Sequence, residues 1–222
     1  MLENNRVGDL LREFPEDVQF IFQEMIPAYQ RGYADYVYKT DKADVQQRRI
    51  KNLAKSFRRM DYFYIMPLDQ ELAVAIATWQ YEAPYDFYDA RADEEDLAEL
   101  LSQEAREGRY FAVIRNGALM GYFCLEWDAA GHGAELGLGM NPLYTGKGQG
   151  RAFYQTIEDY IRTNYPACRQ LDLAVADFNG RARHLYQAVG FTEQESYLQE
   201  TNGGHYPFVK MTKQLSQPSD AE

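Results

Sequence analysis

The stretch Thr145-Gly-Lys-Gly-Gln-Gly150 follows a strand-like segment, Ala134 to Met140, and precedes a helix-like segment, Arg151 to Thr163. Alternate glycines free the turn of side chains, so consecutive backbone N–H groups can point into one concavity, and the helix adds its positive end. This pattern predicts an anion site suited to a diphosphate. The spacing matches neither a Walker A loop nor a dinucleotide fingerprint, and a plain glycine-rich turn remains an alternative for the stretch alone.

The flanking sequence predicts an α+β fold, with one mixed sheet and helices on both faces. Asn116-Gly117 joins two apolar runs and predicts a hairpin, because Asn-Gly supplies the positive φ angles of a type I′ turn. The expected strands are Tyr62–Met66, Phe111–Ile114, Leu119–Leu125, Ala134–Met140, Gln170–Val175, Phe191–Leu198 and His205–Thr212. The expected helices in this part are Asp69–Trp79, Glu94–Glu107, Arg151–Thr163 and Gly180–Val189.

Composition separates two parts of the chain. The 222 residues carry a net charge of −11, but residues 1–60 have 11 basic and 9 acidic residues (+2), whereas residues 61–222 have 12 and 25 (−13). This balance argues against a nucleic-acid surface. Two isolated cysteines indicate neither a disulfide scaffold nor a zinc site, and no metal is expected. Without a leader-like or membrane-spanning segment, we expect a cytoplasmic protein that does not bind membranes, with residues 214–222 as a disordered tail.

A second motif, Asn179-Gly-Arg-Ala-Arg-His-Leu-Tyr-Gln-Ala-Val-Gly-Phe191, follows the glycine-rich stretch. Together the two motifs resemble the GNAT acetyltransferase superfamily over about residues 62–213, so that 61–213 is the expected domain. The resemblance departs from the family signature at Thr145, where the family has Gln or Arg. It implies a GNAT-like mixed central sheet flanked by helices, and acetyl-CoA as cosubstrate.

The resemblance also implies an activity: transfer of an acetyl group to a primary amine by direct attack in a ternary complex. A non-catalytic acyl-CoA-binding protein that contacts a partner is the alternative. Asn179 could also be only a helix cap, and Arg183 only a solvent-exposed residue. The residues implied to bind the cofactor are Leu138, Met140, Thr145, Gly146, Lys147, Gly148, Gln149, Gly150, Arg151, Asn179, Arg183 and Tyr186.

Two residues are candidates for the proton transfers of such a reaction. Tyr186 occupies the position of the family's general acid, although it could simply pack the helix onto the sheet. Glu135 precedes the cofactor loop and shares a strand face with Gly137 and Gly139, which we expect to leave room for an acceptor. A water relay is the alternative to Glu135 as base. The backbone N–H of Leu138 or Met140 is expected to polarise the thioester carbonyl.

The segment from Trp79 to Asp89 is expected to build the acceptor pocket, because this region varies with substrate in the superfamily. Its aromatic and acidic residues suit a cationic acceptor, either a small molecule or a peptidyl amine. About half of its rings could instead be core packing. The expected substrate-binding residues are Trp79, Tyr81, Tyr85 and Tyr88.

Residues 1–60 are expected to be entirely helical and to form a separate module. Its tyrosine helix and its Arg-Arg-Ile helix resemble the bacteriocin-protection (OmpD-associated) family. The resemblance implies no chemistry, and we expect an interaction or dimerisation module. The basic run from Arg48 to Arg59 is either a solvated helix face or a partner-binding surface.

Overall fold

The computed structural model describes residues 3–215, with side chains from residue 6 onward. The chain forms two compact units, Met1–Tyr64 with Ile114–Leu119, and Ile65–Val113 with the chain from Met120 onward. The helices are α1 (Glu3–Glu13), α2 (Glu16–Gln23), α3 (Pro27–Tyr38), α4 (Ala43–Phe57), α5 (Gln70–Ile76), α6 (Glu94–Leu101), α7 (Gln103–Arg106), α8 (Gly150–Asn164) and α9 (Gly180–Ala188), with 3-10 turns η1 (Tyr85–Tyr88) and η2 (Pro142–Tyr144). The strands are β1 (Phe63–Pro67), β2 (Tyr110–Arg115), β3 (Ala118–Trp127), β4 (Gly133–Met140), β5 (Gln170–Ala176), β6 (Thr192–Thr201) and β7 (Gly204–Gln214).

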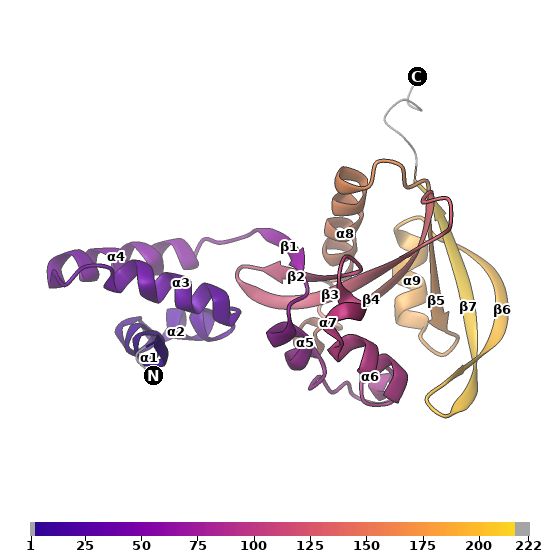
Figure 1. The fold of residues 1–222 in the computed structure, drawn as a ribbon, viewed down its shortest axis with the longest axis horizontal. Helices are drawn as coiled ribbons and strands as arrows, with labels where there is room; N and C mark the ends of the chain where they lie inside the picture. Colours follow the sequence, from indigo (N-terminus) through magenta and orange to yellow (C-terminus); the bar gives the residue numbers. More distant parts are fainter. Residues whose placement is uncertain (1–2, 216–222) are drawn as a thin grey trace, which may run out of the picture. The chain divides into compact units, whose positions relative to one another are not determined.

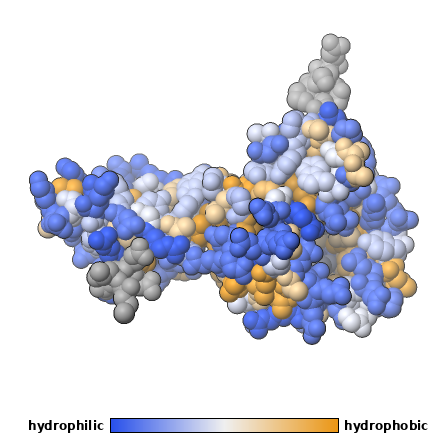
Figure 2. All heavy atoms as spheres, in the orientation of Figure 1, coloured by the Kyte–Doolittle hydropathy of each residue, from blue (hydrophilic) through white to orange (hydrophobic). Residues whose placement is uncertain are grey.

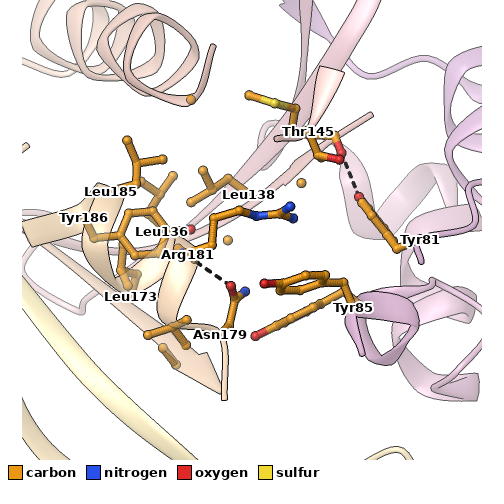
Figure 3. A pocket seen from close by; sticks show the side chains of 18 of the residues that line it. Tyr81, Tyr85, Leu136, Leu138, Thr145, Leu173, Asn179, Arg181, Leu185 and Tyr186 are labelled. Carbon is orange, nitrogen blue, oxygen red and sulfur yellow. Dashed lines mark hydrogen bonds between the residues drawn. The ribbon is translucent and has the colours of Figure 1, made fainter. Parts of the chain in front are cut away.

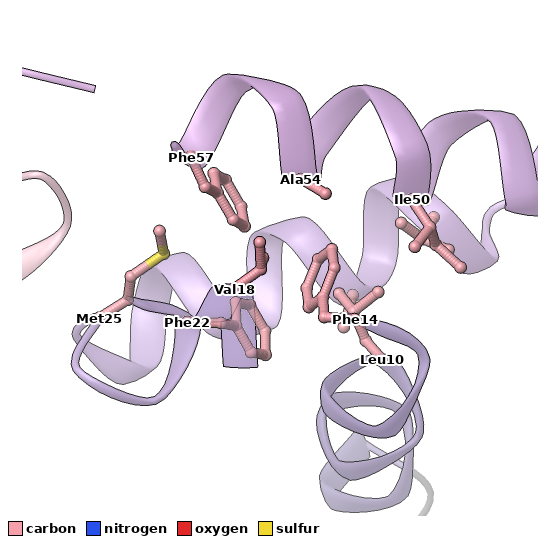
Figure 4. Close-up of a cluster of buried hydrophobic side chains, with 10 residues drawn as sticks. Leu10, Phe14, Val18, Phe22, Met25, Ile50, Ala54 and Phe57 are labelled. Atoms are coloured by element: carbon pink, nitrogen blue, oxygen red, sulfur yellow. The ribbon is translucent and has the colours of Figure 1, made fainter. Parts of the chain in front are cut away.

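The first unit is built from α1 to α4 around an aliphatic and aromatic core (Figure 4). Phe22 and Phe57 stack at a ring-centroid distance of 6.3 Å, and Phe14 meets Phe22 edge-on at 5.3 Å. Proline stands at two helix starts, since Pro15 directly precedes α2 at its N-cap position and Pro27 is the first residue of α3. In the view of Figure 2, hydrophilic side chains cover most of this unit.

The tip of the β2–β3 hairpin belongs to the first unit. Asn116 and Gly117 have φ angles of 52° and 84°, which confirms the predicted Asn-Gly turn. The N–H of Ile26 donates to the carbonyl of Gly117 at 2.7 Å. A Cβ on Gly117 would lie 2.7 Å from Met25 Cγ, so this close approach requires glycine.

The predicted mixed α+β class is confirmed by a seven-stranded sheet of order β1-β2-β3-β4-β5-β7-β6, flanked by helices (Figure 1). β4 pairs antiparallel with β3 and parallel with β5, and β7 lies antiparallel between β5 and β6. Helix α8 covers one face, where Phe153 lies close to Gly121 and Tyr160 packs on Phe123. On the other face Trp79, just after α5, contacts the ring of Tyr122.

Several local predictions differ from the structure. The helix predicted over residues 94–107 is broken at Ser102, because its hydroxyl accepts a hydrogen bond from Ala105 N–H and caps the separate helix α7. The tail was predicted from residue 214, but Gln214 lies in β7 and Leu215 is buried, and residues 216–222 lie outside the described part. None of the helices described is long and apolar enough to cross a membrane.

Candidate active site

The site begins where two parallel strands stop pairing. β4 pairs with β5 only from Gly133 to Glu135, opposite Gln170 to Asp172, although both strands continue. Beyond Glu135, β4 keeps its ladder with β3 and β5 keeps its ladder with β7. The two facing edges therefore diverge into a wedge, and a cavity of about 840 Å³ is lined by residues of both edges.

The register shows which backbone groups of β4 face this wedge. Asn141 N–H donates to Met120 carbonyl at 2.8 Å, which places the hydrogen-bonded pairs of the β3–β4 ladder at Tyr122 with Gly139 and at every second pair from there. The intervening residues Leu136, Leu138 and Met140 therefore direct N–H and C=O away from β3, toward β5. Consistent with this, the Met140 carbonyl accepts from the Tyr81 hydroxyl at 2.9 Å across the cavity.

The glycine-rich loop closes the wide end of the wedge. Gly146 and Gly148 have φ angles of +71° and +73°, a region that favours glycine, and α8 begins at Gly150. A Cβ on Gly150 would lie 2.8 Å from Leu185 Cδ2, so this glycine lets α8 approach α9. The predicted cofactor residues that line the cavity are Leu138, Met140, Thr145, Gly146, Gly148, Gln149, Gly150, Arg151, Asn179 and Tyr186.

Two predicted cations, Lys147 and Arg183, are not among the residues lining the cavity. The Arg183 guanidinium pairs with Asp177 at 2.8 Å and binds both carboxylate oxygens of Glu193, at 2.9 and 3.1 Å. These two acids tie Arg183 to neighbouring chain segments, outside the cavity lining. The spacing of the motif could not show this, because both partners come into place only in the folded chain.

Arg181 is the cation that the sequence reasoning missed. It extends into the cavity between Leu138 and Tyr85 (Figure 3), with its guanidinium carbon 4.1 Å from the centre of the Tyr85 ring. Its Nη1 would lie 3.7 Å from a Cβ on Gly146, so it neighbours the loop. Within residues 6–215, no carboxylate forms an ion pair with it. The sequence feature that could have identified Arg181 is its position in the first turn of the helix of the second motif.

Asn179 and Tyr186 lie at the β5 side of the cavity. The Asn179 side chain caps α9 by accepting a hydrogen bond from Ala182 N–H at 3.1 Å, as one of the two interpretations of this residue predicted. It also lines the cavity. Tyr186 is 9 % exposed, and burial raises the pKa of its hydroxyl well above the ordinary value, with a smaller contribution from Tyr88. Tyr186 therefore stays protonated at neutral pH and is available as a hydrogen-bond donor.

Glu135 lines the cavity at the last β4–β5 pair, where the strands separate. Gly137 and Gly139, which were expected to leave room beside it, also line the cavity, and side chains of β3 pack close against both glycines. A Cβ on Gly137 would lie 2.6 Å from Cys124 Sγ, and one on Gly139 would lie 2.5 Å from the Tyr122 ring. The two glycines make room for side chains of the neighbouring strand β3, because directly opposed residues of an antiparallel pair share one face.

The wall of the cavity that was predicted to bind the acceptor is aromatic and acidic. Of the predicted residues, Tyr81, Tyr85 and Tyr88 line it, whereas Trp79 is not in the lining and its ring lies 6.1 Å from that of Tyr122. The sequence reasoning did not single out Tyr110, Tyr122, Cys124, Asp93 or Asp96, which also line the cavity.

Burial raises the pKa values of two side chains in this wall, Cys124 and Asp96. It raises the pKa of the Cys124 thiol to about 11, so the group is a thiol at neutral pH. The pKa of Asp96 is also raised, by burial and then by the carboxylates of Asp93, Glu99 and Glu95. Within residues 6–215, no group of three His, Cys, Asp or Glu side chains could hold a metal ion.

The sequence pattern described as "Acetyltransferase (GNAT) family" matches residues 61–191. No curated protein matches. Spermidine N-acetyltransferase from Vibrio cholerae, solved with CoA and spermine, is similar in structure, with a TM-score of 0.56, 24 % identity, and coverage of 68 % of this chain and 95 % of that one.

Two further structures agree in fold. A K23-Y30 chimera of the Vibrio cholerae enzyme and hSSAT has a TM-score of 0.53 at 25 % identity, over 68 % of this chain and 95 % of that one. The yncA protein of Salmonella typhimurium, solved with its cofactor acetyl-CoA, has a TM-score of 0.51 at 20 % identity, over 69 % and 94 %. The sheet, the glycine-rich loop and the matched pattern agree: this chain belongs to the acetyltransferase (GNAT) family, whose enzymes use acetyl-CoA.

Proposed function

We propose that this protein transfers an acetyl group from acetyl-CoA to a primary amine by direct attack in a ternary complex. One observation carries the proposal: the wedge between β4 and β5 joins a backbone edge, a glycine-rich loop and a buried tyrosine in one cavity. An extended amide chain can add to such an edge through main-chain hydrogen bonds. The pantetheine arm is a chain of this kind.

The residues around the wedge fit the cofactor part by part. Leu136, Leu138 and Met140 offer backbone groups to the pantetheine arm. The N–H groups of the loop and the positive end of α8 suit a pyrophosphate. Arg181 supplies positive charge near the loop, whereas Lys147, which was expected to bind the cofactor there, is not in the cavity lining. Arg151 lines the cavity as well, although its guanidinium donates to the Ala188 carbonyl at 3.1 Å.

The chemistry needs a base, an acid and a polarised carbonyl. Acetyl-CoA, when bound, supplies an acyl group activated as a thioester. Tyr186 then donates its proton toward the leaving sulfur as the carbon–sulfur bond breaks; its raised pKa makes it a weaker acid, so the transfer has to be concerted with that cleavage. Glu135 accepts the proton of the acceptor ammonium, directly or through water. The Leu138 or Met140 N–H stabilises the developing oxyanion.

The acceptor is proposed to be a cationic amine. The cavity wall places aromatic faces of Tyr81 and Tyr122 together with the carboxylate of Asp96, and rings with carboxylates suit an ammonium group. Residues 61–222 carry a charge of −13, which favours a basic substrate. Spermidine and spermine appear in the names of the similar structures, and polyamines therefore belong in a first panel of acceptors.

Acyl transfer is measured by release of CoA thiol from acetyl-CoA with a panel of amines, di- and polyamines and peptides with free N-termini. The expected result is release that depends on one class of amine and falls in Tyr186→Phe. The alternative function, a non-catalytic acyl-CoA-binding protein, predicts calorimetric binding of CoA with no release across the whole panel. The role of the N-terminal module, including dimerisation through its helices, remains a prediction from sequence.

A further inference from the structure

A buried ionic cluster lies behind the cavity, on the side of α8 that faces β7. Glu158 of α8 is 4 % exposed and accepts from Arg162 Nε at 2.9 Å and Nη2 at 2.7 Å. It also accepts from Lys213 Nζ of β7. Burial raises the pKa of Glu158, but hydrogen bonds from Lys213 and Arg162 outweigh this effect and the pKa lies below its ordinary value. A charged carboxylate is therefore held inside the domain.

Lys213 has a second partner, and this partner belongs to α9. Its Nζ donates to the Val189 carbonyl at 2.6 Å, at the residue that ends the helix. The last carbonyls of a helix have no partner within it and carry partial negative charge, so an ammonium group there satisfies and stabilises the helix end. Lys213 thus bridges α8 and the C-terminal end of α9.

The turn that Lys213 binds is in contact with Tyr186. Phe191 N–H donates to the Tyr186 carbonyl at 2.9 Å, closing the turn that follows α9. The Tyr186 ring contacts the Phe191 ring at 5.9 Å, and Phe191 contacts the buried Tyr154 at 5.6 Å. Lys213 Nζ lies 5.1 Å from the Tyr154 ring centre. The turn at residues 189–191 is therefore held by one ammonium group on one side and supports Tyr186 on the other.

We propose that Lys213 is a positioning residue: its bridge from Glu158 to the Val189 carbonyl fixes the end of α9 and thereby the direction of the Tyr186 hydroxyl in the cavity. Lys213 is not in the cavity lining and acts only through α9. The inference rests on the proposed function, because Tyr186 has a catalytic role only in acyl transfer.

The test is a double-mutant cycle of Lys213→Met and Tyr186→Phe, with Lys210→Met as control. Lys210 lies three residues earlier on β7 and pairs with Asp172 at 3.5 Å, away from α9. A misplaced catalytic group costs about tenfold to a hundredfold in rate, and this loss in kcat is expected for Lys213→Met. The calorimetric Kd of CoA is expected to stay within about twofold, because the loop and the β4 edge are untouched. In the Tyr186→Phe background, Lys213→Met is expected to lower kcat no further.

A spectroscopic readout does not depend on turnover. With ring-13C-labelled tyrosine, the Cζ resonance of Tyr186 is assigned by its loss in Tyr186→Phe, and it is expected to shift in Lys213→Met but not in Lys210→Met. Lys213→Arg, which keeps the charge, is expected to recover kcat in part. An unmoved resonance, or an equal loss of kcat with and without Tyr186, overturns the inference. A wild-type chain that releases no CoA with any amine contradicts the proposed function instead, and the resonance still tests Lys213.

Discussion

Replacing Arg181 by methionine tests the assignment of the cofactor's charged end. The substitution keeps the unbranched aliphatic stem and removes the guanidinium that lies between Tyr85 and the glycine-rich loop. Arg183, two residues later on the same helix, is the matched control, because its guanidinium is bound by Asp177 and Glu193. If Arg181 binds the pyrophosphate, Arg181→Met weakens CoA binding and Arg183→Met does not.

The expected change in CoA affinity is the hydrogen bond that Arg181 would make to the pyrophosphate minus the contact with the Tyr85 ring that it would lose. A hydrogen bond to a charged group contributes about 1.5 to 3 kcal/mol, and leaving the Tyr85 ring costs about 0.5 to 1 kcal/mol at an exposed site. The difference of about 0.5 to 2.5 kcal/mol corresponds to a Kd for CoA raised about 2-fold to 70-fold in Arg181→Met.

The assay is calorimetry with CoA, followed by kcat/KM for acetyl-CoA and for S-acetylpantetheine, which has no phosphates. Arg181→Met is expected to lower kcat/KM only with acetyl-CoA, and Arg183→Met is expected to leave the Kd of CoA unchanged. Equal CoA affinity in wild type and Arg181→Met, or a larger loss in Arg183→Met, would refute the reasoning.

Three further outcomes are expected. Tyr186→Phe lowers kcat about 100-fold or more with an unchanged Kd for CoA, and full activity in steady-state assays would remove the tyrosine as acid. Gly148→Val is expected to cost about 1 to 2 kcal/mol of backbone strain and to weaken CoA binding. Gly108→Val, at φ +72° in equally open space, is expected to lower the melting temperature in the same way but to leave the affinity for CoA unchanged. Because the pKa of Glu158 is lowered by folding, its carboxylate stabilises the protein above the ordinary pKa of 4.5, and this stability is lost as pH falls through the lowered value. Urea unfolding of Glu158→Gln is then expected to show a smaller loss of stability below pH 4.5 than wild type, and parallel pH profiles would contradict this.

Local sequence signals predicted most of the elements. Asn116-Gly117 adopts the expected left-handed pair, and Asp69 caps α5 by accepting from Leu72 N–H at 2.9 Å. Such features depend on the residue itself and its immediate neighbours, and a sequence displays both. The predicted helix over residues 94–107 was wrong for the same kind of reason, since the capping hydroxyl of Ser102 was overlooked.

The space within the candidate site depends on side chains of the neighbouring strand, which the sequence of β4 does not reveal. Gly137 and Gly139 were interpreted as room for an acceptor, and the structure shows that they also make room for Cys124 and Tyr122 of the adjacent strand. The register that places them opposite one another depends on the whole β3–β4 ladder. No local pattern in β4 contains that information.

The sequence by itself determined the family, the glycine-rich loop before α8, and the presence of Tyr186 on the helix of the second motif. These are short segments whose chemistry follows from residue type and spacing. The tertiary structure decided that β4 and β5 separate after Glu135, and that Arg181 enters the cavity while Arg183 is held by Asp177 and Glu193. An arginine's role depends on which charges and rings lie around it, and those neighbours are brought together only by folding.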